Sequence, residues 1–501
     1  MILPAHSGQD DKRCERGVRS RRAFLQQTAL GAAATLAGSS AAWPAPAAPR
    51  RRPPNLLFIN VDQLSLQAIP QFGCAHVETP NIDRLAQRGT SFELSHCADP
   101  LCSPSRACWF TGRAPTEQGM LFNDLGFQLR PEIPDLGAWL RGAGYETFHV
   151  GKWHIPGREV GGSFNVLHEG STIGDHGDAA TARACEALLR NRSAGGDPFL
   201  LVAGLMNPHD ICEWINVQMH WTNLNVTAPE QFPYPQIESQ LAPLPDNFTF
   251  DRREPEFFVA RVRRPQEHYT AAWCQRMWQF YAWSYYRQVE MVDAAIGRIL
   301  DALENSPHAD NTLVMFTSDH GDSMGCHRLI HKISLYDAAV RVPMIVAWPS
   351  HVAENRTDRT HLVSGFDVTP TLCDYAGTAP PPDMRGRSLR ELIEGRGPAW
   401  RDYVVAHSFV VGRMVRSARY KYIAYRGDKT DQLFDLAGDP GETRNLAADP
   451  AAAGPLAEHR RMLAEWESRL KPLAEPPGGW LKQIFEVRAK KKAKPDKKRT
   501  R

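Results

Sequence analysis

Short apolar segments that end in polar residues constrain the fold of this chain more than any other feature. Four of them have the length and composition of buried strands: residues 55–61, 146–150, 198–205 and 312–317. Polar residues follow each segment within a few positions, namely Asp62 and Gln63, Lys152 and His154, His209, and Asp319 and His320. Because helical patterns lie between the segments, we expect an α/β fold with a mainly parallel sheet between helices. Sheets of this kind place their sites at the carboxyl ends of their strands.

The predicted elements divide the chain into a large and a small region. In the large region, residues 54–399, helices are expected at 82–87, 135–143, 179–189, 273–303 and 370–375. The small region, residues 400–476, shows short strands at 404–407, 412–416, 420–425 and 432–436 and a helix at 455–470. This pattern predicts a C-terminal subdomain with a small antiparallel sheet and one helix. Residues 212–264 lack clear periodicity, and we interpret them as an insertion over the site that selects the substrate.

Charge is distributed unevenly along the chain. Residues 1–52 carry a net charge of +6 and residues 488–501 one of +8, which leaves −11 for the rest of a chain whose net charge is +3. We do not expect the acidic body to bind nucleic acid, and it must capture an anionic substrate with a local group of cations. We interpret the basic tail, residues 488–501, as disordered and solvated; binding to a polyanion or the cell envelope is the alternative.

The first 47 residues have the order of regions found in an export signal. Arg21 and Arg22 precede the apolar run 28–43, and Ala45-Pro46-Ala47 offers a small-residue cleavage site. The twin arginine predicts a Tat-type signal peptide over residues 1–47, the Tat translocon as a partner, and a periplasmic or extracellular location in a bacterium. The alternative is a disordered basic arm. No other segment is predicted to span a membrane, and the ten cysteines show no dense disulfide framework.

The segment Cys102-Ser103-Pro104-Ser105-Arg106 combines a thiol with the start of a helix. Pro104 suits the first helical turn, so Cys102 is expected near a helix N-terminus, where backbone N–H groups and the macrodipole favour anions. Arg106 lies one turn further and adds a permanent charge with a planar fork of donors. The residues alone leave two interpretations about even. One is an activated nucleophile beside a bound oxyanion, and the other is a buried structural cysteine.

The polar residues at the strand ends offer the chemistry of a metal-dependent site. Asp62, Gln63, Asp319 and His320 are suitable ligands for a divalent cation. Their oxygen atoms favour calcium or magnesium, and the imidazole also admits manganese. Two further groups combine lysine with histidine: Lys152 and His154, which point to the same side of an extended chain, and His209 with Lys332, which occur later in the sequence.

The motif C-S-P-S-R, followed by Thr111-Gly112-Arg113, resembles the signature of the sulfatases. The same family is similar in the order of its later motifs, K-x-H, P-H, D-[N/H]-G and K. In this chain they correspond to Lys152 and His154, Pro208-His209, Asp319-His320-Gly321, and Lys332. The resemblance covers most of residues 54–475. It implies a formylglycine-dependent type I sulfatase with the large domain of the alkaline phosphatase-like superfamily. It also implies that a maturation enzyme oxidises Cys102 to formylglycine (3-oxoalanine), whose hydrate is the nucleophile in a sulfuric ester hydrolase.

The resemblance assigns further roles. Asp62, Gln63, Asp319 and His320, with an oxygen of modified Cys102, bind the metal; calcium is favoured, with manganese and magnesium as alternatives. The positive groups on the transferring sulfate are Lys152, Lys332 and Arg106. His209 protonates the leaving alcohol, and His154 deprotonates the second hydroxyl of the hydrate to expel sulfate.

The predicted substrate is a sulfated polysaccharide or oligosaccharide. Aromatic rings of the insertion suit stacking on sugars, although packing within the insertion is an equal alternative: Trp214, Trp221, Phe232 and Tyr234. Arg261, Arg263 and Arg264 suit a carboxylate or further sulfates. The pairs with Gln63 and His320 resemble those of choline sulfatases and phosphonate monoester hydrolases. Hydrolysis of a phosphonate or phosphate monoester, or of choline or aryl sulfate, is therefore the alternative, and a glycan-binding protein without turnover is a third hypothesis.

Overall fold

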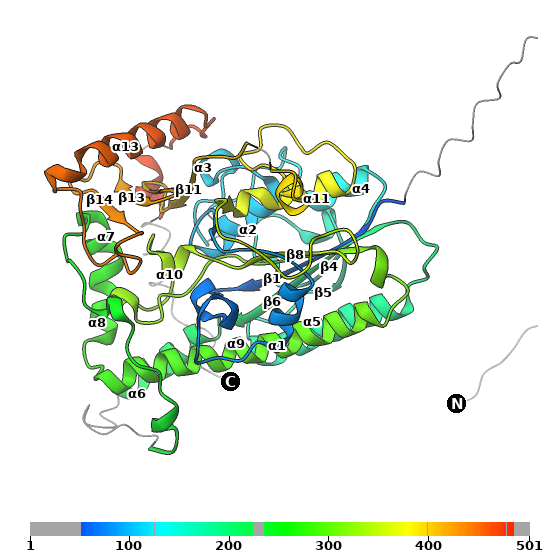
Figure 1. Cartoon of the computed structure of the whole chain (residues 1–501), viewed down its shortest axis with the longest axis horizontal. Helices are drawn as coiled ribbons and strands as arrows, with labels where there is room; N and C mark the ends of the chain where they lie inside the picture. Colours follow the sequence, from blue (N-terminus) through cyan, green and yellow to red (C-terminus); the bar gives the residue numbers. More distant parts are fainter. Residues whose placement is uncertain (1–51, 124–125, 224–234, 398, 477, 485–501) are drawn as a thin grey trace, which may run out of the picture. The chain divides into compact units, whose positions relative to one another are not determined.

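An eight-stranded sheet forms the centre of the fold in the computed structural model, which describes residues 52–123, 126–223, 235–397, 399–476 and 478–484 (Figure 1). Its strand order is β5-β4-β6-β1-β7-β8-β2-β9. The strands span Asn55–Asp62 (β1), Gly89–Phe92 (β2), Glu146–Gly151 (β4), Asn165–His168 (β5), Phe199–Pro208 (β6), Thr312–Ser318 (β7), Met344–Ala347 (β8) and Arg356–Asp358 (β9). Within this sheet only β8 runs antiparallel to its neighbours, so the predicted mainly parallel sheet is confirmed.

Helices cover both faces because successive residues of a strand point to opposite sides of the sheet. Leu57 and Ile59 of β1 belong to a core shared with α1, α5 and α9, whereas Leu56 and Phe58 pack in a core shared with α2, α4 and α11. These helices span Pro80–Gln87 (α1), Cys102–Thr111 (α2), Leu136–Gly142 (α4), Gly174–Asn191 (α5), Gln275–Glu304 (α9) and Val368–Tyr375 (α11). The long helix predicted at 273–303 is thus present, and all residues of β1 are buried between the two layers.

The predicted insertion contains more helix than its composition indicated. It includes most of α6 (Ile211–Asn223) and α7 (Glu256–Phe258), and α8 (Arg264–Thr270) follows it directly. Ile211 and Ile215 of α6, one turn apart, are buried in the core with α9. That packing stabilises a helix whose polar and aromatic residues obscure the periodicity. The remaining short elements are β3 (Ser95–His96), β10 (Val363–Ser364), α3 (Pro115–Gln118), α10 (Asp337–Val340) and α12 (Arg390–Ile393).

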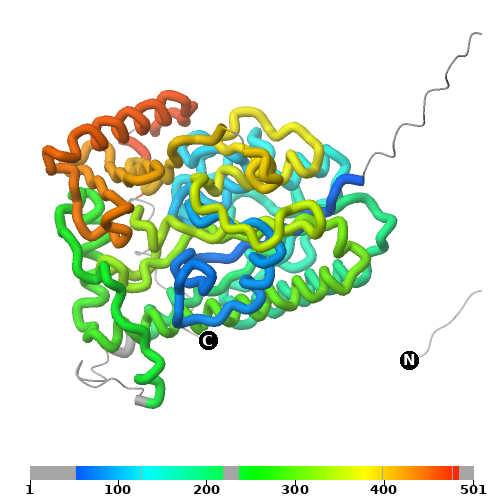
Figure 2. Tube along the Cα trace, viewed as in Figure 1, coloured from blue at the N-terminus to red at the C-terminus, as the bar shows by residue number. Residues whose placement is uncertain are grey.

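A four-stranded antiparallel sheet and one helix form the C-terminal part, as predicted. The elements are β11 (Tyr403–Ser408), β12 (Gly412–Ser417), β13 (Tyr420–Tyr425), β14 (Gln432–Asp435) and α13 (Ala453–Ser468). Leu456 and Trp466 of α13 pack on Val415 of the sheet. Figure 2 shows the chain before α8 beside these strands, where the rings of Phe257 and Tyr425 stack at 5.4 Å. A domain boundary at residue 400 stays a prediction.

The predicted signal peptide, residues 1–47, and the basic tail, residues 488–501, lie outside the described residues. Within the described part of the chain, no helix combines the length and the apolar character needed to cross a membrane. The nine cysteines of that part are all free thiols.

Candidate active site

The ends of two neighbouring strands bring the predicted metal ligands together. β1 and β7 pair in parallel with Val61 opposite Ser318. The residues that follow in register, Asp62 and Asp319, therefore lie at the same edge of the sheet. The Asp319 N–H donates to the Val61 carbonyl at 3.2 Å, which keeps the two chain segments together just past β7.

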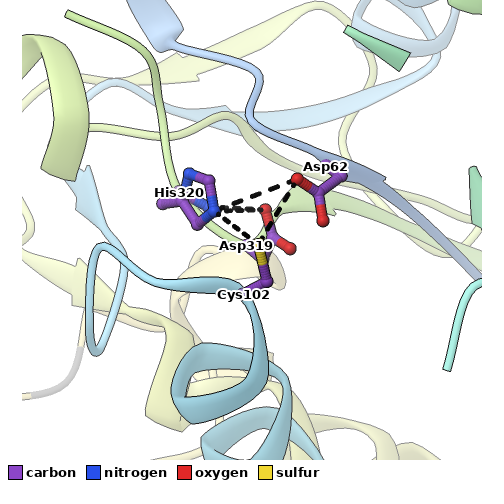
Figure 3. A group of neighbouring side chains, drawn as sticks. All are labelled: Asp62, Cys102, Asp319 and His320. Carbon is purple, nitrogen blue, oxygen red and sulfur yellow. Dashed lines mark hydrogen bonds and ion pairs between the residues drawn. The ribbon is translucent and has the colours of Figure 1, made fainter. Parts of the chain in front are cut away.

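Cys102 joins this pair from the other side, because α2 begins at Cys102 near Pro104, as the sequence predicted. Its Sγ lies 3.2 Å from Nε2 of His320 and 3.7 Å from Oδ1 of Asp62. One possible ligand atom from each of Asp62, Cys102, Asp319 and His320 lies within 4.8 Å of the others, and all four residues are buried (Figure 3). The candidate nucleophile and the candidate metal ligands thus form one cluster.

The donor set of this cluster fits a divalent cation. Nδ1 of His320 lies 2.9 Å from the carbonyl oxygen of Gly321, which can only accept a hydrogen bond. Nδ1 therefore carries a hydrogen, and Nε2 is the nitrogen that would offer a lone pair to a bound cation, the arrangement expected of a metal-ligating histidine. Figure 3 shows Nε2 directed at the carboxylates of Asp62 and Asp319 and at the sulfur of Cys102. Carboxylate oxygens with one imidazole nitrogen suit calcium, magnesium or manganese.

The pKa values of the two carboxyl groups, Asp62 and Asp319, are shifted in opposite directions. Burial raises the pKa of Asp319 to about 7, and the negative charge of Asp62 acts in the same direction. Burial also opposes ionisation of Asp62, but Lys152, His209 and Lys332 outweigh it and hold the pKa of that carboxyl well below its usual range. A cation between the two would favour the charged form of both.

Arg106 braces the carboxylates from within the protein. Its side chain is fully buried, and Nε donates to Oδ2 of Asp319 at 2.9 Å while an amino group lies 3.4 Å from Oδ2 of Asp62. A further pair of bonds, both at 3.0 Å, reaches Oδ1 of Asn60 and the carbonyl of Lys152. These contacts hold the metal-ligand pair in place. Direct contact of Arg106 with a sulfate stays a prediction.

Two lysines approach the cluster, Lys152 from the end of β4 and Lys332 from the loop before α10. Lys152 forms an ion pair with Oδ2 of Asp62. Nζ of Lys332 lies 2.7 Å from Oε1 of Gln63 and 3.2 Å from Sγ of Cys102. Because Nζ of Lys332 contacts both atoms, Oε1 of Gln63 and Sγ of Cys102 lie beside the same ammonium group.

These positive groups change the acid–base state of Cys102. Burial and Asp62 both raise its pKa, but Lys332, Lys152 and His320 outweigh them and bring the pKa well below the ordinary value of a thiol. The environment therefore stabilises negative charge at position 102, as expected where an oxyanion forms.

The two predicted acid–base histidines differ in how the structure places them. Burial lowers the pKa of His209 to about 4, and Lys332 and Lys152 add to that effect. His154 follows β4 with φ +54°, and its buried Nδ1 has no hydrogen-bond partner among the described residues. The free ring nitrogen of His154 can therefore bond to a ligand. Among the described residues, no hydrogen bond joins His154 to Cys102.

A cavity of about 650 Å³ opens beside the cluster. His209 and Lys332 line it, together with Cys212, Arg261, Gln266, Tyr269, His331 and Phe409 among others. Among the described residues that line it there is no aspartate or glutamate, and Lys332 and Arg261 provide the positive side chains. The cavity thus meets the cluster at Lys332 and favours a negatively charged ligand.

The predicted substrate residues of the insertion have different fates. Trp214 is partly buried and packs against the core, with its ring 5.9 Å from Trp273 and 5.2 Å from Phe280, which favours the packing interpretation for this ring. Arg263 is buried in an ion pair with Glu254 and is therefore part of the scaffold. Arg264 is exposed, and Arg261 lines the cavity. The side chains of Trp221, Phe232 and Tyr234 lie outside the described residues.

Several residues of the site lie outside the motifs that are visible in the sequence. Cys212 lies in α6 with Sγ 3.5 Å from Oε1 of Gln63, and Tyr269 lies in α8 and exposes its ring to the cavity. Asp322, which accepts a hydrogen bond from Gln63, follows Asp319-His320-Gly321 directly, and this short spacing from the metal ligands was its one available signal.

Comparison with known proteins agrees with this geometry. The family profile described as Sulfatase matches residues 54–378, and the profile described as N-sulphoglucosamine sulphohydrolase, C-terminal, matches residues 325–468. The chain therefore belongs to the sulfatase family of the alkaline phosphatase-like superfamily, and it is a sulfuric ester hydrolase. The family implies a metal and a formylglycine, and the buried group of Asp62, Cys102, Asp319 and His320 lies where both are expected.

Individual relatives cover most of the chain. A Delta 4,5-hexuronate-2-O-sulfatase of Bacteroides thetaiotaomicron is 31% identical over 452 residues, which cover 85% of this chain and 91% of the relative. An N-acetylglucosamine-6-O-sulfatase of the same organism is 27% identical over 493 residues, with 83% and 87% covered. The solved structure of a 2-O GAG sulfatase has a TM-score of 0.72 and 30% identity, and the match covers 86% of this chain and 98% of that one.

Proposed function

We propose that the chain removes sulfate from a sulfated acidic sugar of a glycan. The observation that carries this proposal is the position of Cys102 between two different environments. On one side its Sγ contacts Nε2 of His320 in the candidate metal cluster, and on the other it contacts Nζ of Lys332 at the wall of the cavity. A sulfate that enters the cavity would reach the nucleophile, a metal and a lysine at one point.

Two groups complete the proposed centre. A divalent cation, for which we favour calcium with manganese or magnesium as alternatives, would neutralise sulfate charge and lower the pKa of a hydroxyl when held by Asp62, Gln63, Asp319 and His320. Formylglycine made from Cys102 by a formylglycine-generating maturation enzyme would supply, as its hydrate, the attacking hydroxyl.

The residues of the chain perform the remaining tasks. Lys332 binds a sulfate oxygen at the cavity wall, while Lys152 and Arg106 keep the metal carboxylates charged and oriented. His209 donates the proton to the leaving oxygen. Because its pKa is about 4 without substrate, it needs the negative charge of a bound sulfate to hold that proton at neutral pH. His154 takes the proton that accompanies release of sulfate.

The cavity supports an acidic sugar as the substrate. Arg261 provides a second cation besides Lys332, and the described lining residues carry no carboxylate that would repel a second anionic group. The ring of Tyr269 is 40% exposed and offers a face on which a sugar can stack. Of the relatives described above, one acts by its name on a hexuronate, which is an acidic sugar, and another on N-acetylglucosamine, which is a neutral amino sugar.

A substrate panel tests the proposal. Enzyme with a measured formylglycine content is assayed on a 2-O-sulfated hexuronate disaccharide, a 6-O-sulfated hexosamine, choline sulfate, an aryl sulfate and a phosphonate monoester. We expect the highest kcat/KM on the sulfated hexuronate. A higher value on the phosphonate or on choline sulfate would favour the alternative hydrolases, and binding without turnover by fully oxidised enzyme would favour a glycan-binding protein.

We also propose that the chain is exported to the periplasm or beyond through the Tat translocon, on the evidence of Arg21 and Arg22, the apolar run 28–43 and the small-residue segment 45–47. Replacement of both by lysine is expected to leave the protein in the cytoplasm. Cell fractionation measures where this variant is located, and unchanged export would contradict the proposal.

A further inference from the structure

A buried hydrogen-bond network joins the proposed metal ligand Gln63 to Asp322 and Tyr281, two residues to which the proposed reaction gives no role. Oδ1 of Asp322 accepts from the hydroxyl of Tyr281 at 2.7 Å, and Oδ2 accepts from Nε2 of Gln63 at 2.7 Å. Asp322, Tyr281 and Gln63 are fully buried. The Tyr281 hydroxyl also accepts from the backbone N–H of His331 at 3.0 Å, which ties the network to the residue before Lys332.

This network determines which end of the Gln63 amide faces the cluster. A carboxylate can only accept hydrogen bonds and an ammonium group can only donate them. Asp322 therefore takes Nε2, while Nζ of Lys332 takes Oε1 at 2.7 Å. A flipped amide would place its NH₂ against Lys332 and its oxygen against Asp322. Both contacts are repulsive, and burial makes them costly.

The backbone of Gln63 is held by the same helix face. Gln63 has φ +73°, in the left-handed region that residues with a side chain seldom adopt. Its N–H donates to Oδ1 of Asp319 at 3.0 Å, and its carbonyl accepts from the Tyr285 hydroxyl at 2.6 Å. Tyr281 and Tyr285 lie one turn apart on α9. One face of α9 therefore supports both the side chain and the backbone of a single residue.

We infer that Asp322 and Tyr281 are positioning residues, which hold the side-chain oxygen of Gln63 towards the cation site and Lys332. The inference rests on the proposed function, because Gln63 is a cation ligand only in that proposal. Partners behind a metal ligand typically contribute 10- to 100-fold to metal affinity. Asp322→Asn replaces one acceptor oxygen by an NH₂ group, so that the amide of Gln63 loses the partner that prevents its flip.

Calcium binding tests the inference without any substrate. The full chain is stripped of metal with a chelator and titrated with Ca²⁺ in a calorimeter, as wild type, Asp322→Asn, Gln63→Ala and the double variant. We expect Asp322→Asn to raise the Kd roughly tenfold when Gln63 is present and to add nothing when Gln63 is alanine. An equal effect in both backgrounds, no effect, or no calcium binding by the wild type would overturn the inference.

Tyr281→Phe provides a second variant if Asp322→Asn does not fold, and its Kd is expected to rise in the same direction. Tyr336→Phe is the matched control, because the Tyr336 hydroxyl is also buried, donates to Glu254 at 2.8 Å and accepts from Gln432 at 2.9 Å. An equal rise in Kd in both variants would show a general loss of stability and overturn the inference. Failure of the sulfated-sugar proposal would leave these calcium measurements unaffected.

Discussion

Two buried groups of charged side chains differ in whether their charges are satisfied within the protein. In the group below the C-terminal sheet, Nζ of Lys421 lies 2.7 Å from Oδ1 of Asp337 and 2.6 Å from Oε1 of Glu442, and Lys421 is fully buried. In the group around Cys102, Lys332 contacts a thiol and an amide oxygen and also lines a cavity of about 650 Å³.

The difference separates a structural group from a chemical one. Lys421 on β13 and Asp337 on α10 join the C-terminal sheet to the large region, and the carboxylates neutralise the buried lysine. The Cys102 group keeps unlike charges close but leaves Lys332 open to a ligand. Side chains with shifted pKa values beside a cavity are candidates for catalysis, whereas a buried ion cluster with all its charges paired mainly holds elements together.

The largest effect is expected in the group around Cys102. Cys102→Ala removes the precursor of the nucleophile and should lower kcat by several orders of magnitude, because the covalent step has no substitute. Steady-state kinetics on the best sulfate ester of the panel measures this effect, with the melting temperature as the control for folding. Turnover close to that of the wild type would contradict the assignment of Cys102.

In the group around Lys421, a substitution should lower stability and leave turnover unchanged. Lys421→Met leaves Glu442 buried without its cation and Asp337 with only the longer ion pair to Arg341 at 3.7 Å, and we expect the free energy of unfolding to fall by about 3–5 kcal/mol. The kcat of the folded fraction should stay unchanged. Denaturant titration and kinetics of the same sample measure both quantities. A lost kcat with an unchanged free energy of unfolding would show that the two groups are not separate in function.

The cavity wall provides a smaller effect that sharpens the comparison. Arg261→Gln should raise KM for a sulfated sugar with a carboxylate by roughly 10- to 100-fold, the range expected when a charge-assisted hydrogen bond of about 1.5–3 kcal/mol is lost. A sulfated sugar without a carboxylate should be affected less. Arg264→Gln is the matched control, since Arg264 is exposed and is not part of the cavity lining. Equal changes in the two variants would remove Arg261 from substrate recognition.

The smallest effect concerns pH and histidines outside the Cys102 group. Burial lowers the pKa of His96 to about 3 despite the attraction of Asp337, and burial with Arg413 lowers the pKa of His407 well below its usual range. Both are neutral when folded and become charged when unfolded. Their contribution to stability is therefore complete above pH 6.5 and is lost as the pH falls, by about 1.4 kcal/mol per pH unit for each histidine.

His407→Gln tests this linkage. Nε2 of His407 accepts from Nε1 of Trp466 at 3.2 Å, and the glutamine oxygen can accept in its place. Denaturant titrations between pH 7 and pH 5 should show a shallower loss of stability in this variant than in the wild type. An unchanged slope would mean that His407 is not one of the groups responsible.

Most of the sheet and the chemistry of its edge could be predicted from the sequence. β1, β6 and β7 are buried on both faces, which requires continuous apolar runs that are visible without a structure. Pro104 indicated the start of α2 at the thiol. The antiparallel direction of β8 could not be predicted, because a short apolar run carries no information on the direction of pairing.

The contacts of the site show a similar limit. Arg261 and Arg263 are two residues apart in the same short segment, yet one lines the cavity and the other is buried against Glu254. The difference depends on the direction in which each side chain leaves the helical segment. Tyr281 and Asp322 are also far apart in sequence, and only the packing of α9 against the strand ends brings them to Gln63.

Local pattern and spacing were enough to predict the family resemblance, the central strands β1, β4, β6 and β7 and the residue types at the edge of the sheet. The short strands β2, β5 and β9 and the helices within residues 212–264 were not predicted. Which charges are closed in ion pairs and which face a cavity depends on the tertiary structure. Burial and partner geometry, rather than residue type, separate Lys421 from Lys332, and both depend on segments that are distant in the chain.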